Sequence, residues 1–190
     1  MFNKFYFLLV LIAFTTVNTN AQTYYGLKVG LNASTFYGDV DNKTIKPSMH
    51  FGAVAEFTLT DAFSVQPELL FSMQGYQKKG ESIIKHHYHY VTAPIMMKYF
   101  LTNEITLDFG PQFGYLIFAQ SSDGEYEYEE LKETTSVFDY GIAVGASYEI
   151  DDGMNINLRY YQGIANVLDT PDDLRASNGV IQLSLGYKFY

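Results

Sequence analysis

The stretch Val180-Ile-Gln-Leu-Ser-Leu-Gly-Tyr-Lys-Phe-Tyr190, at the end of the chain, decides the fold. Its odd positions from Ile181 to Phe189 are all apolar or aromatic, whereas its even positions from Gln182 to Lys188 are small, polar or charged. Alternation with a period of two residues is typical of a β-strand, because successive side chains point to opposite faces. The stretch therefore predicts a strand with one apolar and one polar face.

Seven further segments carry the same alternation, so the sequence predicts eight strands. They cover residues 25–34, 51–59, 63–74, 90–99, 105–117, 139–150 and 154–161. Charged residues never fall on the apolar phase, whereas the polar phase holds both charges and many glycines. A water-soluble barrel has an apolar interior, and an outer-membrane barrel has an apolar exterior and a polar interior. The pattern indicates an all-β, eight-stranded, antiparallel up-and-down barrel of the outer membrane, with small side chains inside.

The connections between these segments alternate in length. Residues 60–62, 102–103 and 151–153 form short connections, and residues 37–49, 76–87, 119–137 and 164–178 form long ones. Outer-membrane barrels have short periplasmic turns and longer extracellular loops. An even number of strands then places both termini on the periplasmic side.

The first 21 residues have the pattern of a secretory signal peptide. Lys4 precedes the apolar run Phe5 to Phe14, and Thr19-Asn20-Ala21 is a suitable cleavage site. A membrane anchor is the alternative, but the run is shorter than the roughly 20 residues that a spanning helix needs. We expect a cleaved signal peptide at 1–21 and a barrel domain at 22–190. The chain has no cysteine, so no disulfide stabilises it, and its net charge of −9 argues against a nucleic-acid partner.

Three prolines fall inside predicted strands, at Pro67, Pro94 and Pro111. A closed barrel has no edge strand on which a missing N–H is harmless. We therefore expect bulges, or pairing offsets near the strand ends, at these positions.

Four segments carry a resemblance to a known family. They are Ser64-Val-Gln-Pro-Glu-Leu-Leu-Phe-Ser continuing to Gly75-Tyr76, Tyr90-Val-Thr-Ala-Pro-Ile-Met-Met-Lys-Tyr99, Phe109-Gly-Pro-Gln-Phe-Gly-Tyr-Leu116 and Asp139-Tyr-Gly-Ile-Ala-Val-Gly145. Together they resemble the PorT-like family of outer-membrane β-barrel proteins, in which prolines tend to occur at the same places. The resemblance implies an outer-membrane location and, for one branch of the family, a role in a protein-secretion apparatus, whose proteins would then be partners.

The charged side chains of the polar phase form the first candidate site. An isolated charge in a packed lumen would be very costly, so these groups should pair. We predict a salt-bridge plug of Lys28, Lys188, Glu56 and Glu68, joined by Lys98, Asp108, Glu149 and Arg159. Lys188 is expected to point inward beside Lys28. A proton relay or a narrow ion path through the same residues is the alternative.

The aromatic end of the last strand forms the second candidate site. Gly186, Tyr187, Phe189 and Tyr190 should serve as the signal that the barrel-insertion machinery recognises. The PorT-like family often ends on Phe, whereas here Tyr190 follows Phe189.

Histidines and acidic residues in the long connections raise the question of metal binding. His87 and His89 share one face at a spacing of two, close enough to hold a metal, although a solvated patch is the simpler interpretation. The run Asp123 to Glu130 alternates Glu with Tyr and predicts a hairpin above the membrane, and three further acids follow in the last long connection, namely Asp169, Asp172 and Asp173. An anionic rim could bind calcium or be bridged by divalent cations to lipopolysaccharide. No cofactor is expected.

These features predict a non-enzymatic structural or interaction module that acts through its extracellular loops or periplasmic turns. Outer-membrane lipid and lipopolysaccharide are its expected surroundings. The alternatives are a secretion-apparatus component and a lipid-modifying enzyme. The enzyme would need a histidine beside a serine or an acid at the outer rim, and the candidates are Ser48, His50, His86, His87 and Asp123. The chain contains no phosphate loop, nucleophile elbow or zinc-protease motif.

Overall fold

The computed structural model describes residues 22–39, 42–79, 83–122, 129–130, 135–151, 153–168 and 174–189. These ranges fold into ten β-strands: β1 (Thr23–Gly38), β2 (Lys43–Thr44), β3 (Lys46–Thr60), β4 (Phe63–Lys79), β5 (Ile83–Phe100), β6 (Ile105–Ser122), β7 (Glu129–Glu130), β8 (Phe138–Asp151), β9 (Met154–Gly163) and β10 (Ala176–Phe189). In these ranges there is no helix long and apolar enough to cross a membrane. The predicted signal peptide and Tyr190 lie outside the described residues.

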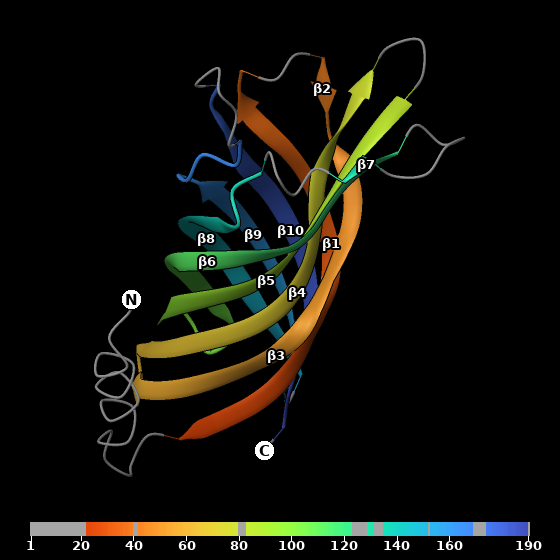
Figure 1. The fold of residues 1–190 in the computed structure, drawn as a ribbon. Coiled ribbons are helices and arrows are strands. Elements are labelled where there is room, and N and C mark those ends of the chain that lie inside the picture. Colours follow the sequence, from red (N-terminus) through yellow and green to blue (C-terminus); the bar gives the residue numbers. More distant parts are fainter. Residues whose placement is uncertain are drawn as a thin grey trace.

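Eight long strands close into the predicted antiparallel barrel (Figure 1). Their order is β4-β3-β1-β10-β9-β8-β6-β5, and β5 pairs with β4 to complete the ring. The first and last of these strands are neighbours, with Tyr25 opposite Phe189. Both therefore meet at the end of the barrel that carries the short turns.

The two faces of the wall have opposite character, as the alternation predicts. On β6 the side chains alternate strictly between exposed and buried from Ile105 to Leu116. Leu183 on β10 is 51% exposed, whereas its neighbours Gln182 and Ser184 are buried. On β5 the outward apolar face runs from Val91 to Tyr99, close to the roughly 9–11 residues with which a tilted strand spans a bilayer. This apolar band is the lipid-facing belt.

The prolines interrupt the hydrogen-bond ladders without changing the register. The β3–β4 ladder skips the position of Pro67, the β4–β5 ladder skips Pro94, and the β5–β6 ladder skips Pro111. Each proline keeps its pairing with the strand on its other side. The expectation of bulges or offsets at the prolines is therefore wrong, because each ladder lacks two residue pairs at its proline and then resumes in the same register.

One side of the wall continues well beyond the belt. β4 and β5 remain paired from Gly75 opposite His87 to Lys79 opposite Ile83, so the predicted loop 76–87 is mostly a hairpin. The short strand β2 pairs with β4, and β7 pairs with β6. We call this extension, formed by residues 43–44, 75–79, 83–89, 118–122 and 129–130, the outer sheet; it stands above the rest of the barrel in Figure 1.

Candidate functional site: the closed lumen

The periplasmic end of the lumen is filled by ion pairs around Glu56. Lys98 Nζ lies 2.9 Å and Lys188 Nζ 3.5 Å from Glu56 Oε2, and Lys188 Nζ also lies 3.1 Å from Glu149 Oε2. Ser64 Oγ donates a hydrogen bond of 3.0 Å to Glu56 Oε1. The carboxylate of Glu56 is thus satisfied by two cations and a hydroxyl, as a buried charge requires.

A second cluster forms around Glu68, further along the barrel. Lys28 Nζ lies 2.6 Å from Glu68 Oε1, and Arg159 contributes two hydrogen bonds of 2.8 Å to the two carboxylate oxygens. Gln66 Nε2 donates to Glu68 Oε1 at 2.7 Å. In the ring, three strands separate β4 from β9 in each direction, so the Glu68–Arg159 pair crosses the lumen from wall to wall.

Asp108 is the predicted network member that receives no ion pair. Its carboxylate instead accepts hydrogen bonds from Thr106 Oγ1 at 2.8 Å, Ser147 Oγ at 2.5 Å and Asn157 Nδ2 at 2.9 Å. Lys188 and Lys28 both point inward, but they serve different carboxylates. The structure therefore arranges seven of the eight charges in two ion-paired clusters and surrounds the eighth with neutral donors.

Above the charged clusters, His50 is held between two polar side chains. Its Nδ1 lies 2.7 Å from Asn32 Oδ1 and its Nε2 2.8 Å from Ser184 Oγ. Because Asn32 Nδ2 already donates to Met49 O and Met73 O, Asn32 Oδ1 acts as the acceptor and His50 Nδ1 carries the proton. Ser184 then donates to Nε2. The ring of His50 is only 1% exposed, so this trio lies deep in the lumen rather than at the outer rim.

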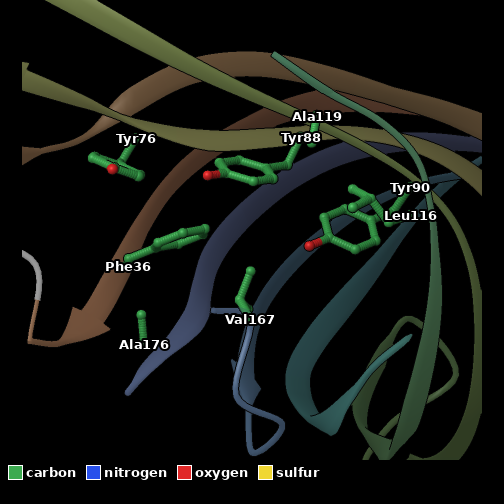
Figure 2. Packing of buried hydrophobic residues seen from close by; sticks show 8 residues of the cluster. All are labelled: Phe36, Tyr76, Tyr88, Tyr90, Leu116, Ala119, Val167 and Ala176. Carbon is green, nitrogen blue, oxygen red and sulfur yellow. The ribbon is translucent and has the colours of Figure 1, made fainter. Parts of the chain in front are cut away.

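The outer mouth of the lumen is filled by apolar and aromatic side chains that sequence analysis missed (Figure 2). The ring of Phe36 lies 4.9 Å from that of Tyr76 and 5.1 Å from that of Tyr88, between centroids. The remaining members of the cluster are Tyr90, Leu116, Ala119, Val167 and Ala176. The sequence signal that could have predicted this cluster is the presence of apolar residues at the inward-facing strand positions just beyond the belt.

The histidine pair points away from the lumen. The rings of His87 and His89 lie 6.3 Å apart, and His89 packs edge-on against Phe71 and Phe118. Burial, together with the nearby Lys46 ammonium and other basic groups, lowers the pKa of His87 to about 4. In the described ranges, no three His, Cys, Asp or Glu side chains are grouped to hold a metal.

The candidate residues of a rim enzyme are dispersed. Ser48 Oγ donates to Met73 O, and His86 stacks on Tyr76 with ring centroids 4.4 Å apart. His50 lies in the lumen, and Asp123 lies outside the described residues together with the other acids of 123–128 and 169–173. Of the acidic residues predicted for the rim, the structure describes only Glu129 and Glu130, which form β7.

The proposed assembly signal forms the lipid-facing end of β10. Tyr187 and Phe189 both point outward, with their ring centroids 5.3 Å apart in an edge-to-face arrangement. Gly186 faces inward, where a Cβ would meet the side chain of Asn155. The predicted strand end is therefore aromatic on its lipid side.

The closed ring of eight strands, the apolar belt and the charged lumen together define an integral outer-membrane β-barrel. The chain belongs to the family described as outer membrane protein beta-barrel domain, whose model matches residues 20–169. No functionally curated protein matches its sequence.

Two of the solved structures that share the fold do so at low sequence identity. One is Ail, the attachment invasion locus protein of Yersinia pestis, in complex with the heparin analogue sucrose octasulfate, with a TM-score of 0.52, 16% identity and coverage of 88% of this chain and 99% of that one. The other is Neisserial surface protein A, with a TM-score of 0.54, 11% identity and coverage of 87% and 97%. At such identities the similarity shows the fold alone.

Proposed function

We propose that this protein is a non-conducting anchor that holds the outer sheet above the membrane for binding to a protein partner. The observation that carries the proposal is the Glu68–Arg159 pair, which crosses the lumen at 2.8 Å. Ion pairs fill the lumen on the periplasmic side of this pair, and the aromatic cluster fills it on the outer side. We assign contact with a partner to the outer sheet, because its strands continue past this filled lumen.

The outer sheet has features that suit a protein partner. Among the described residues, its short strands β2 and β7 are each paired with one neighbouring strand only, and an extended segment of a partner can add a strand at such an edge. Ile45, beside β2, is 55% exposed. Ail was solved with a sulfated sugar, but the net charge of −9 on this chain disfavours a polyanion as its ligand.

Planar-bilayer recording of the purified protein tests the closed lumen. We expect no steady conductance, because both ends of the lumen are occupied by packed side chains. Steady and large conductance would overturn the proposal. Replacing Glu68 and Arg159 together by serine removes the pair that crosses the lumen, and this variant should conduct more often than the wild type.

Site-specific photo-crosslinking in intact cells tests the contact surface. A photoreactive residue at Ile45 samples the outer edge, and one at Asp61, in an exposed periplasmic turn, is the matched control. Protein adducts from Ile45 alone support the proposal. Adducts from Asp61 with periplasmic or inner-membrane proteins would instead favour the secretion-apparatus function that the PorT-like resemblance implies, and adducts from neither position would contradict both functions.

A further inference from the structure

One buried cation has no acidic partner among the described residues. Lys46, on β3, is 4% exposed, and its Nζ atom donates a hydrogen bond of 3.0 Å to Gln74 O. The other buried cations of the described ranges are all ion-paired, namely Lys28, Lys98, Arg159 and Lys188. A buried ammonium without a counterion is costly. An anion held close to this part of the wall would therefore stabilise the barrel.

Further basic groups lie near Lys46, where β5 continues into the outer sheet. Lys85 is exposed, and the rings of His87 and His89 are partly buried. The titratable groups that act most strongly on His87 are Lys46, His89, Lys85 and His86, and all of them are basic. Lys46 also acts on His89, and Lys85 acts on Lys46. The net charge of the chain is −9, but this part of the wall is locally basic.

Three of these basic side chains form a row on the outward face of β5. Lys85, His87 and His89 are spaced by two residues, so they share one face of the strand. The residues directly opposite them on the two neighbouring strands are all uncharged, namely Gln77, Gly75 and Met73 on β4 and Ser122, Gln120 and Phe118 on β6. The row therefore presents one ammonium and two imidazole rings with no acid directly beside them.

The row begins at the upper edge of the lipid-facing belt. His89 packs edge-on against Phe71 and Phe118. Aromatic side chains gather where the hydrocarbon of a bilayer meets its headgroups, and basic side chains at that height attract anionic headgroups. The row therefore lies where the headgroups of the outer leaflet would contact the wall.

We propose that Lys85, His87 and His89 bind the phosphate group of a lipid headgroup in the outer leaflet. A Lys ammonium forms charge-assisted hydrogen bonds with phosphate oxygens, and an imidazole N–H can donate to them whether or not the ring is protonated. The buried Lys46 adds a second positive charge at longer range.

This lipid site is separate from the edge that we assign to a protein partner. The net charge of −9 disfavours a long polyanion, but a single headgroup would meet only the basic row. A bound headgroup would hold the base of the outer sheet against the membrane surface.

Titration of the full-length barrel, folded in neutral detergent micelles, with short-chain phosphatidic acid tests the site. We expect saturable binding, and no binding of the diacylglycerol with the same chains, which lacks the phosphate. The double variant Lys85→Gln/His87→Gln should bind phosphatidic acid about tenfold or more weakly, because it loses a charged donor and an imidazole N–H. Lys78→Gln removes an exposed lysine from the opposite face of β4 and is the matched control, whose affinity should not change.

Two outcomes of this titration would overturn the proposal. Equal affinity of the double variant and the wild type would show that the row does not hold the phosphate. Equal affinity of the wild type for inorganic phosphate and for phosphatidic acid would show an anion site without a preference for lipid.

NMR of the wild-type barrel covers the case in which the double variant does not fold. Phosphatidic acid should shift the ring resonances of His87 and His89 on the outward face. The ring of His50, which is buried in the lumen, is the internal control and should not respond. Unchanged resonances of both outward histidines, or an equal shift of His50, would refute the lipid site.

Discussion

Glu68 and Arg159 form a bidentate ion pair across the barrel although 91 residues separate them in the chain. Both side chains are at most 1% exposed, and Lys28 completes the cluster as a second cation on Glu68. The pair joins opposite walls of the barrel, and the proposed non-conducting function rests on it.

Removing the negative charge at this position should destabilise the barrel. In Glu68→Gln, Lys28 and Arg159 remain buried without a counterion, and breaking a buried pair in this way costs about 3–5 kcal/mol. Guanidinium-induced unfolding in lipid vesicles measures the loss. The double variant Glu68→Gln/Arg159→Met should be less unstable than the sum of the single variants, and strict additivity would show that the pair contributes little.

A charge on the lipid-facing belt should be equally damaging for a different reason. Leu183 lies on the outward face of β10 between inward-facing Gln182 and Ser184. Leu183→Arg places a cation in the hydrocarbon and should lower the free energy of unfolding by about 2–4 kcal/mol. Ile164→Arg, at an exposed position just after β9, is the matched control with little expected effect. Equal stability of the two variants would contradict the face assignment.

The faces of the barrel could be predicted from the sequence, but the pairing of its charges could not. Period-two alternation tells which side chains enter the lumen, because a strand can turn only one face inward. Which acid meets which base depends on strand tilt and shear, which set the height of each residue in the ring. Lys28 and Lys188 come from adjacent strands, yet one pairs with Glu68 and the other with Glu56 and Glu149.

The β4–β5 hairpin of the outer sheet and the aromatic cluster were not predicted, because above the belt the apolar side chains no longer mark the outward face. Within the bilayer the apolar side chains face out, but beyond it the exterior is water, and Tyr76 and Tyr88 turn inward while Lys85 and His87 turn outward. A prediction that assigns every apolar position to the outward face therefore ends the strands too early. Polar residues such as Lys78 further obscured the hairpin, which is held by backbone pairing.

A tyrosine ring covers a glycine on the outer surface near the rim. A Cβ at Gly179 on β10 would collide with the ring of Tyr37 on the neighbouring strand β1. Gly179→Ala should therefore displace the ring and cost about 1–3 kcal/mol, as overpacking does. The double variant Gly179→Ala/Tyr37→Ala removes the collision, and its stability should equal that of Tyr37→Ala alone. A further loss in the double variant would locate the cost in the backbone of Gly179 instead.

The histidines of the outer sheet should make its opening depend on pH. Burial, followed by the charge of nearby lysines, lowers the pKa of His86 from its usual 6.5 and lowers that of His87 to about 4. Between pH 6.5 and 4, the opened hairpin binds protons that the closed hairpin does not. The stability that the closed hairpin has above pH 6.5 is therefore lost as the pH falls. The equilibrium constant for opening rises by up to about tenfold per pH unit and per histidine. Hydrogen exchange of the amides at residues 83–89, corrected for the intrinsic pH dependence, measures this opening. His87→Gln, which cannot be protonated, should weaken the dependence, and an unchanged profile in that variant would show that titration of His87 does not control the outer sheet.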